Sequence, residues 1–175
     1  MKHLLLIRHA KSDWSHPSLP DKDRPLNKRG QRDAPFMALM CRKTCRRPNI
    51  LVSSPAVRAR ETALRFAREY EIPERDIFIH PDLYEAAPET ILDVIRSLDD
   101  SYGSAAIVGH NPGLVNLSRI LLPKHIDSFP TCAVLEMKLE TGSFSRITPA
   151  CAKIRSFLYP KQFSRKDRER HAEIE

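Results

Sequence analysis

Leu4-Leu5-Leu6-Ile7, followed at once by Arg8-His9, is the stretch of sequence that decides the fold class. Four aliphatic residues in a row, without alternation, are typical of a strand that is covered on both faces, as in a parallel sheet. Ile50 to Val52 and Ala105 to Val108 repeat the pattern. The sequence therefore predicts an α/β fold: a three-layer sandwich with a mostly parallel mixed sheet and helices on both faces.

Helical patterns separate these predicted strands. Apolar residues recur at steps of three and four after Pro55, Pro88 and Pro112, and each proline suits the opening of a helix. Asn111 is expected to cap the third of these helices. The segment from Asn27 to Cys45 also has a helical pattern, but Pro35 lies inside it and predicts a kink or a restart.

The last third of the chain has a different texture. A strand from Cys132 to Leu139, a Thr141-Gly142 turn and a second strand from Phe144 to Thr148 predict a hairpin. Residues 161–175 are strongly charged and predict a frayed helix or a tail. We therefore expect one domain over residues 1–160 and a charged C-terminal tail over residues 161–175.

Length and charge narrow the function classes. The chain has 175 residues, a formal net charge of +7 and no apolar run long enough to span a bilayer. With no signal peptide in the sequence and four cysteines that form no CxxC pair, we expect a cytoplasmic protein without disulfides and without a metal site. The positive charge indicates an anionic partner but does not say which kind.

The residues that end the three predicted strands point to a phosphate site. Arg8 and His9 follow the first strand, Arg58 lies just after the second, and His110 follows the third. In an open α/β sheet, ligands bind beyond the carboxyl ends of the strands, and nearby helix N-termini favour anions. Arginine forks match phosphate oxygens, and surrounding positive charge keeps an imidazole neutral and nucleophilic.

Four motifs occur in order along the chain: Leu6-Ile7-Arg8-His9-Ala10-Lys11-Ser12, Arg24 to Gly30, Ser53-Ser54-Pro55-Ala56-Val57-Arg58-Ala59-Arg60-Glu61-Thr62, and Val108-Gly109-His110-Asn111-Pro112. They resemble the motifs of the histidine phosphatase superfamily, which includes phosphoglycerate mutases and acid phosphatases. The resemblance covers about residues 2 to 160, and the short length together with Phe129 to Ala133 resembles the branch of small phosphohistidine phosphatases.

The resemblance implies a two-step phosphoryl transfer without a cofactor. His9 is expected to attack phosphorus while Arg8, Arg58 and His110 hold the phosphoryl oxygens, and water then releases phosphate. Glu85 matches the acid that protonates the leaving group.

Five further positions in these motifs bear on the site. Lys11 and Ser12 are candidate phosphate contacts. Glu61 is expected to lie with Arg60 on a solvated or salt-bridged helix face, with Glu61 and Thr62 as candidates for positioning Arg58 because they complete the family motif. Ala10 departs from the family's glycine, which would matter if that position required a positive φ.

The expected substrate is a phosphorylated small molecule or a phosphohistidine-bearing protein, and we expect neither nucleic acid nor a membrane as partner. The sequence does not settle the oligomeric state. A phosphoglycerate mutase-like phosphotransferase is the main alternative, but the chain has no long insertion to form a lid. A non-catalytic phosphate- or nucleic-acid-binding protein is the alternative from another class.

One further motif matches the spacing of a different class of phosphatase but is not expected to be used. Cys41 to Arg47 fits the Cys-x5-Arg spacing of cysteine-dependent phosphatases, in which a thiolate attacks phosphorus. The predicted position of this segment at the end of a helix, with no glycine, argues against that use.

Overall fold

A six-stranded sheet forms the centre of the fold. In the computed structural model, which describes residues 1–172, the strand order is β3-β2-β4-β1-β5-β6. Strands β1 to β4 are parallel, and β5 and β6 are antiparallel to their neighbours, so the predicted mostly parallel mixed sheet is confirmed. The strands are β1 (Lys2–Arg8), β2 (Ile50–Ser53), β3 (Ile77–Ile79), β4 (Ser104–Gly109), β5 (Val134–Leu139) and β6 (Ala152–Leu158).

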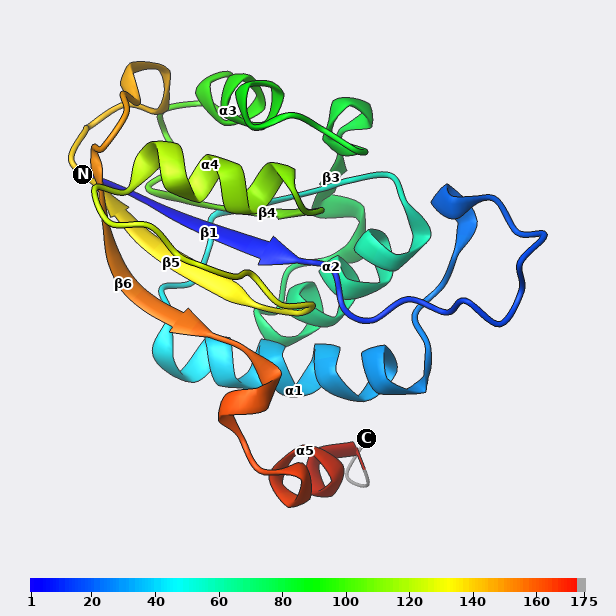
Figure 1. The fold of residues 1–175 in the computed structure, drawn as a ribbon. Helices are drawn as coiled ribbons and strands as arrows, with labels where there is room; N and C mark the ends of the chain where they lie inside the picture. Colours follow the sequence, from blue (N-terminus) through cyan, green and yellow to red (C-terminus); the bar gives the residue numbers. More distant parts are fainter. Residues whose placement is uncertain (173–175) are drawn as a thin grey trace.

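Helices cover both faces of the sheet, which confirms the three-layer sandwich (Figure 1). One face carries α1 (Lys28–Thr44) and α2 (Val57–Glu69), and the other carries α3 (Pro88–Arg96) and α4 (Gly113–Leu121). Strand β1 has an unbroken apolar run because both of its faces are buried under helices. Leu4 and Leu6 belong to the core under α3 and α4, Leu5 and Ile7 to the core under α1 and α2, and all four are fully buried.

Helix α1 is continuous from Lys28 to Thr44, so the helix does not restart at Pro35. Asn27 caps the helix, because its side chain accepts a hydrogen bond from the Gly30 N–H at 2.9 Å. Pro35 removes one N–H donor, but it lies in a row of buried residues from Asp33 to Ala38. Packing against α2 and the sheet therefore keeps the helix in one piece.

All three predicted helices are present, but only one of them begins at the predicted proline. Helix α3 begins at Pro88 as predicted, whereas α2 begins at Val57 and α4 at Gly113, after the prolines that were expected to open them. Asn111 does not cap α4; its amide instead donates to the Phe129 carbonyl at 2.9 Å. This bond ties the segment before β5 to the end of β4.

The second strand of the predicted hairpin was misplaced. The partner of β5 is β6 (Ala152–Leu158), whereas Phe144–Arg146 forms a 3-10 turn. Phe144 and Ile147 are both buried, and their spacing of three suits one face of a helical turn. Strand β6 is harder to recognise because its residues Lys153, Ile154 and Arg155 are exposed at the sheet edge.

The charged C-terminal segment forms helix α5 (Arg165–Ala172) against α1. Arg168 Nη1 lies 3.4 Å from Asp33 Oδ1, and the rings of Phe163 and Phe36 pack edge to face at 5.1 Å. Residues 173–175 of the predicted tail, and the side chain of His171, lie outside the described residues. The domain boundary at residue 160 stays a prediction. No helix within residues 1–172 is long and apolar enough to cross a membrane.

Candidate active site

The carboxyl ends of three parallel strands bring the predicted central residues together. Arg8 is the last residue of β1 and His9 follows it, Arg58 lies in the first turn of α2 after β2, and His110 follows β4. The imidazole rings of His9 and His110 lie 5.0 Å apart, and Arg58 Nε lies 3.3 Å from His9 Nε2. Three segments that are remote in sequence therefore bring these four residues together, and the charge of Arg8 acts on both histidines.

The hydrogen bonds of His9 define which ring nitrogen is free to react. Nδ1 lies 2.7 Å from the Ala10 carbonyl oxygen, which only accepts, so Nδ1 carries the proton. Nε2 accepts from Arg58 Nε and therefore has no proton of its own. The neutral tautomer thus presents a lone pair on Nε2 to the side where Arg58 lies.

Both histidines are held in the neutral form. Burial lowers the pKa of His9 to about 3. The bond to the Ala10 carbonyl opposes this shift, and His110, Arg58 and Arg8 each add a smaller lowering. Burial and the charge of Arg58 lower the pKa of His110 to about 4. Positive charge around a buried imidazole disfavours its protonation. At neutral pH the site combines two neutral imidazoles with two guanidinium groups.

Asp21, which the sequence did not single out, holds Arg58 in place. Arg58 Nη1 donates to the Asp21 carbonyl at 2.6 Å, and Nη2 donates to its carboxylate at 2.9 Å. The Tyr84 hydroxyl donates to the same carboxylate oxygen at 2.8 Å. Burial alone would raise the pKa of Asp21, but the bonds from Tyr84 and Arg58 outweigh it and hold the pKa below its usual range. The carboxylate therefore stays ionised.

Sequence reasoning missed Asp21 and Tyr84 for different reasons. Asp21 lies in a loop between β1 and α1 where acidic and basic residues alternate, and nothing in its pattern separates it from Asp23. Tyr84 directly precedes Glu85, so the correct loop was singled out. The Tyr84 ring also packs edge to face on His110, at 5.7 Å between centroids.

Arg8 and Thr62 tie the ends of the strands to their surroundings. Arg8 Nη1 donates to the Phe129 carbonyl at 3.0 Å, while its buried Nε has no hydrogen-bond partner among the described residues. The Thr62 hydroxyl donates to the Arg58 carbonyl at 2.7 Å and accepts from the Ala10 N–H at 3.0 Å. Thr62 therefore joins the helix that carries Arg58 to the segment that carries His9.

A family model described as "Histidine phosphatase superfamily (branch 1)" matches residues 4–93, which include Arg8, His9 and Arg58. The chain belongs to this superfamily. Rv1276c, an uncharacterized protein of Mycobacterium tuberculosis, is 28% identical over 165 residues, which cover 89% of this chain and 100% of that protein.

Solved structures agree with the family model. A structure described as "putative phosphohistidine phosphatase SixA from Agrobacterium tumefaciens" is 28% identical to this chain, with a TM-score of 0.75 over 91% of this chain and 98% of that one. A protein histidine phosphatase SixA complexed with tungstate has the same fold, with a TM-score of 0.77 and 19% identity over 93% of this chain and 99% of that one. These similarities support phosphatase activity in general.

The family's glycine is replaced without strain in this histidine phosphatase. Ala10 is fully buried and is not among the non-glycine residues with positive φ, which are Glu71, Glu85, Cys132 and Ala150. The backbone at this position therefore does not require a glycine. The departure from the family motif leaves the His9–Ala10 hydrogen bond intact.

Lys11, Ser12 and Glu85 lie at the edge of this centre. Lys11 is exposed and Ser12 is buried, with its backbone bridged to Leu26. Glu85 is exposed, with φ of 49°. None of the hydrogen bonds described for residues 1–170 links these three side chains to the central histidines and arginines. Their roles stay predictions.

No metal site accompanies the histidines. Within the described part of the chain, no three His, Cys, Asp or Glu side chains are grouped as metal ligands would be. The residues around His9 that could stabilise an anion are instead Arg8 and Arg58, whose guanidinium groups carry permanent charge.

Lowering the pH is expected to destabilise the fold through the two central histidines. Because the pKa values of His9 and His110 are lowered to about 3 and about 4, the unfolded chain binds more protons below pH 6.5 than the folded chain does. The free energy of unfolding should therefore fall by about 1–2 kcal/mol per histidine between pH 6.5 and pH 5. Urea unfolding across this range measures the slope, which should be shallower in His110→Asn than in the wild type.

Replacing Cys41 by Ser is expected to leave activity unchanged. Cys41 is fully buried in α1, and a hydrogen bond with Cys45 together with burial raises the pKa of its thiol. A protonated, buried thiol is not a nucleophile. Phosphate release by Cys41→Ser measures this directly, and a large loss of turnover with an unchanged melting temperature would contradict it.

Proposed function

We propose that the chain is a phosphatase that hydrolyses phosphomonoesters or protein phosphohistidine through a covalent intermediate on His9. This proposal rests on the hydrogen bonds of His9, in which Nδ1 pairs with the Ala10 carbonyl and Nε2 pairs with Arg58. With Nδ1 bonded to the Ala10 carbonyl, Nε2 is an unprotonated nucleophile within 3.3 Å of a guanidinium nitrogen. Attack on phosphorus requires a neutral imidazole with a free lone pair.

The first step transfers the phosphoryl group to His9. The Nε2 lone pair forms a bond to phosphorus as the bond from phosphorus to the leaving atom breaks, and that atom takes the electron pair. Arg58 Nε exchanges its bond to His9 for one to a phosphoryl oxygen. Arg8 contributes its buried Nε, and His110 contributes its buried Nδ1; neither atom has a hydrogen-bond partner among the described residues. Such donors stabilise the charge on the phosphoryl oxygens.

In the second step water attacks the phosphorus of phosphorylated His9. The bond between phosphorus and Nε2 breaks, the electron pair returns to Nε2, and the attacking water gives one proton to bulk solvent as inorganic phosphate forms. The low pKa of His9 favours departure of a neutral imidazole. No cofactor is needed for this sequence.

The leaving group decides how much the enzyme needs an acid. An alkoxide must be protonated as it departs, and Glu85 is the candidate because it follows Tyr84, whose ring contacts His110. An imidazole leaving group needs less help. We therefore favour phosphohistidine as the substrate class, in keeping with the similarity to SixA.

A substrate panel tests the proposal. Phosphohistidine peptides and small alkyl and aryl phosphomonoesters are compared by phosphate release, and the enzyme is quenched in alkali to trap acid-labile phosphate on His9. We expect trapped phosphate with every substrate that turns over. Turnover without any phosphoenzyme in a rapid quench would contradict the covalent mechanism.

Glu85→Gln separates the two leaving groups. We expect the substitution to lower kcat for an alkyl phosphomonoester by about 10²-fold and to change kcat for a phosphohistidine peptide less than threefold, as for loss of a general acid. Glu89→Gln, at another exposed acid in the same region, is the matched control. Equal losses on both substrates would remove Glu85 from the role of acid.

A further inference from the structure

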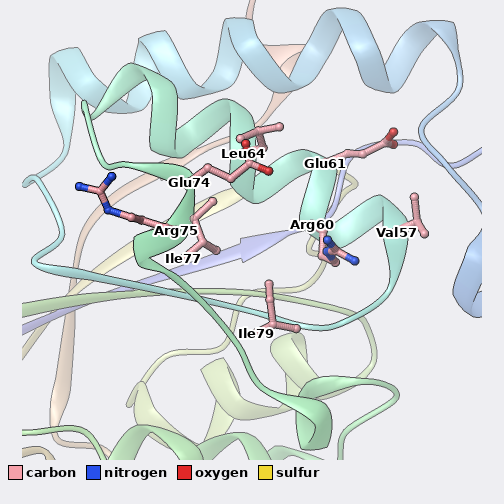
Figure 2. Close-up of a pocket in the computed structure, with 8 residues that line it drawn as sticks. All are labelled: Val57, Arg60, Glu61, Leu64, Glu74, Arg75, Ile77 and Ile79. Carbon is pink, nitrogen blue, oxygen red and sulfur yellow. The ribbon is translucent and has the colours of Figure 1, made fainter.

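A groove of about 660 Å³ lies between α2 and β3 (Figure 2). Its apolar lining comes from Val57 and Leu64 of α2 and from Ile77 and Ile79 of β3. Its charged lining consists of Arg60, Glu61, Glu74 and Arg75, of which Arg60 and Glu61 lie nearest in sequence to Arg58. The catalytic residues Arg8, His9 and His110 do not line it. The mechanism proposed above leaves this groove without a use.

Strand β3 is the outer edge of the sheet and is unusually apolar for an exposed edge. It pairs only with β2, and Phe78 and Ile79 keep 59% and 43% of their surfaces exposed. Phe78 lies on the other face of the strand, where it lines a second hollow of about 290 Å³ with Val52 and Leu98. An edge strand with unpaired backbone groups and an apolar hollow on each face is suited to pairing with another strand.

We propose that the β3 edge binds an extended segment of the phosphorylated polypeptide substrate. An added strand would satisfy the outer backbone groups of β3, and its side chains would point alternately to the two faces of the sheet. Apolar side chains at alternate positions would then enter the groove beside α2. Because β3 has only three residues, the contact is short and suits a transient enzyme–substrate complex.

The position of the groove relative to His9 supports a substrate as the occupant. Strand β3 runs parallel to β2, so its carboxyl end lies at the same edge of the sheet as the catalytic residues. A strand added outside β3 would lie two strand spacings, about 10 Å, from β2, and four spacings, about 19 Å, from β1, which His9 follows. Val57 and Arg60 of the groove flank Arg58 in the sequence. About six extended residues would therefore connect the groove to the phosphorus site.

The charge at the rim specifies the substrate further. Arg60 is exposed, and none of the ion pairs described within residues 1–170 includes it. The neighbouring carboxylate of Glu61 is already engaged, because Oε2 accepts from the Leu26 N–H at 2.7 Å. An acidic side chain of the docked segment would pair with Arg60. The substrate segment is therefore extended, apolar at alternate positions and acidic near the phosphorylated residue.

This inference rests on the proposed phosphatase activity, so its test uses two substrates in parallel. The first is a small aryl phosphate, which reports the chemistry alone. The second is a set of synthetic peptides with one phosphohistidine, an adjacent Glu and a run of alternating Val and Thr on either its amino or its carboxyl side. Matched peptides carry Ser in place of Val. If the aryl phosphate and all peptides are inert, the proposed function fails, and the docking inference that rests on it fails with it. If they are turned over, the docking inference is judged on the variants below.

Ile79→Lys places a charge in the groove, and Ile154→Lys is its matched control on β6, the opposite edge strand, where Ile154 is 46% exposed. We expect Ile79→Lys to lower kcat/KM for a Val peptide about tenfold through KM, as for loss of one anchor residue, and to leave the aryl phosphate rate within twofold. Ile154→Lys should leave both rates unchanged. Equal peptide kinetics for wild type and Ile79→Lys would overturn the inference.

Exchanging the charges of residue 60 and of the peptide tests the docking inference in a second, independent way. Arg60→Glu should raise KM for the Glu peptide, and a peptide with Lys in place of Glu should restore it. A general loss of structure cannot produce this rescue. Light scattering completes the test: a wild-type dimer that becomes a monomer in Ile79→Lys would show that a second copy of the chain occupies the edge, and the inference would be overturned.

Discussion

His9→Ala is expected to abolish turnover of every substrate, with kcat reduced by about 10⁴-fold or more. The substitution removes Nε2, the proposed nucleophile, which the Ala10 carbonyl and Arg58 hold in the unprotonated form. The guanidinium groups of Arg8 and Arg58 remain, so phosphate binding should persist. Steady-state phosphate release measures the loss.

Two further measurements make this expectation specific. Rapid quench of His9→Ala should show no acid-labile phosphate on the protein, whereas the wild type should show a burst. Calorimetry with inorganic phosphate should still detect binding to the variant. Residual turnover within tenfold of the wild type, or a phosphoenzyme of unchanged yield, would contradict the assignment of His9 as nucleophile.

The strand ends that carry the site were predictable because two simple rules act together there. Buried parallel strands have continuous apolar runs, and the polar residue that follows such a run lies at the carboxyl edge of the sheet. His9 and His110 each follow such a run after one intervening residue, Arg8 and Gly109, and their rings lie 5.0 Å apart. Neither inference needed a long-range contact to be known in advance.

The residues that the sequence did not reveal depend on contacts between loops. Asp21 reaches Arg58 from a separate loop, 37 residues earlier in the chain, and Tyr84 meets Asp21 from a third. No periodicity encodes such a meeting, because loop conformation is set by the ends that the fold brings together. The same limit explains the misplaced hairpin, since burial of Phe144 and Ile147 is decided by packing around α3 rather than by the local pattern.

Helix boundaries show a smaller discrepancy of the same kind. Proline was expected in the first turn of three helices, now seen as α2, α3 and α4. Of these, only α3 has a proline, Pro88, in its first turn. Before α2, the Ser54 hydroxyl accepts from the Ala56 N–H at 3.3 Å and lies 2.7 Å from His110 Nε2. The Ser54 hydroxyl, next to the proline that was expected to begin the helix, therefore also contacts His110. The local preference for a helix start is therefore overridden at the candidate active site.

Arg58→Ala is expected to lower kcat by about 10²–10³-fold, as for loss of one charge-stabilising donor group. The geometry makes the loss specific, because the guanidinium contacts His9 through Nε while Nη1 and Nη2 are bound by Asp21. Arg58 can therefore offer Nε to a phosphoryl oxygen without releasing Asp21. Lysine has a single charged nitrogen and cannot make both sets of contacts, so Arg58→Lys should recover less than tenfold of the loss.

Asp21→Asn tests whether Arg58 needs the negative charge of Asp21 or only the hydrogen bonds that Asp21 accepts from it. An amide keeps the shape of the Asp21 side chain and an acceptor for Nη2, so positioning through the Asp21 carbonyl should survive. We expect a loss of kcat of about tenfold or less, smaller than that of Arg58→Ala, as for a residue that acts through another. In Arg58→Ala the carboxylate has no guanidinium to hold, so adding Asp21→Asn should cost nothing further. Additive losses in the double variant would show that Asp21 acts on the substrate independently of Arg58.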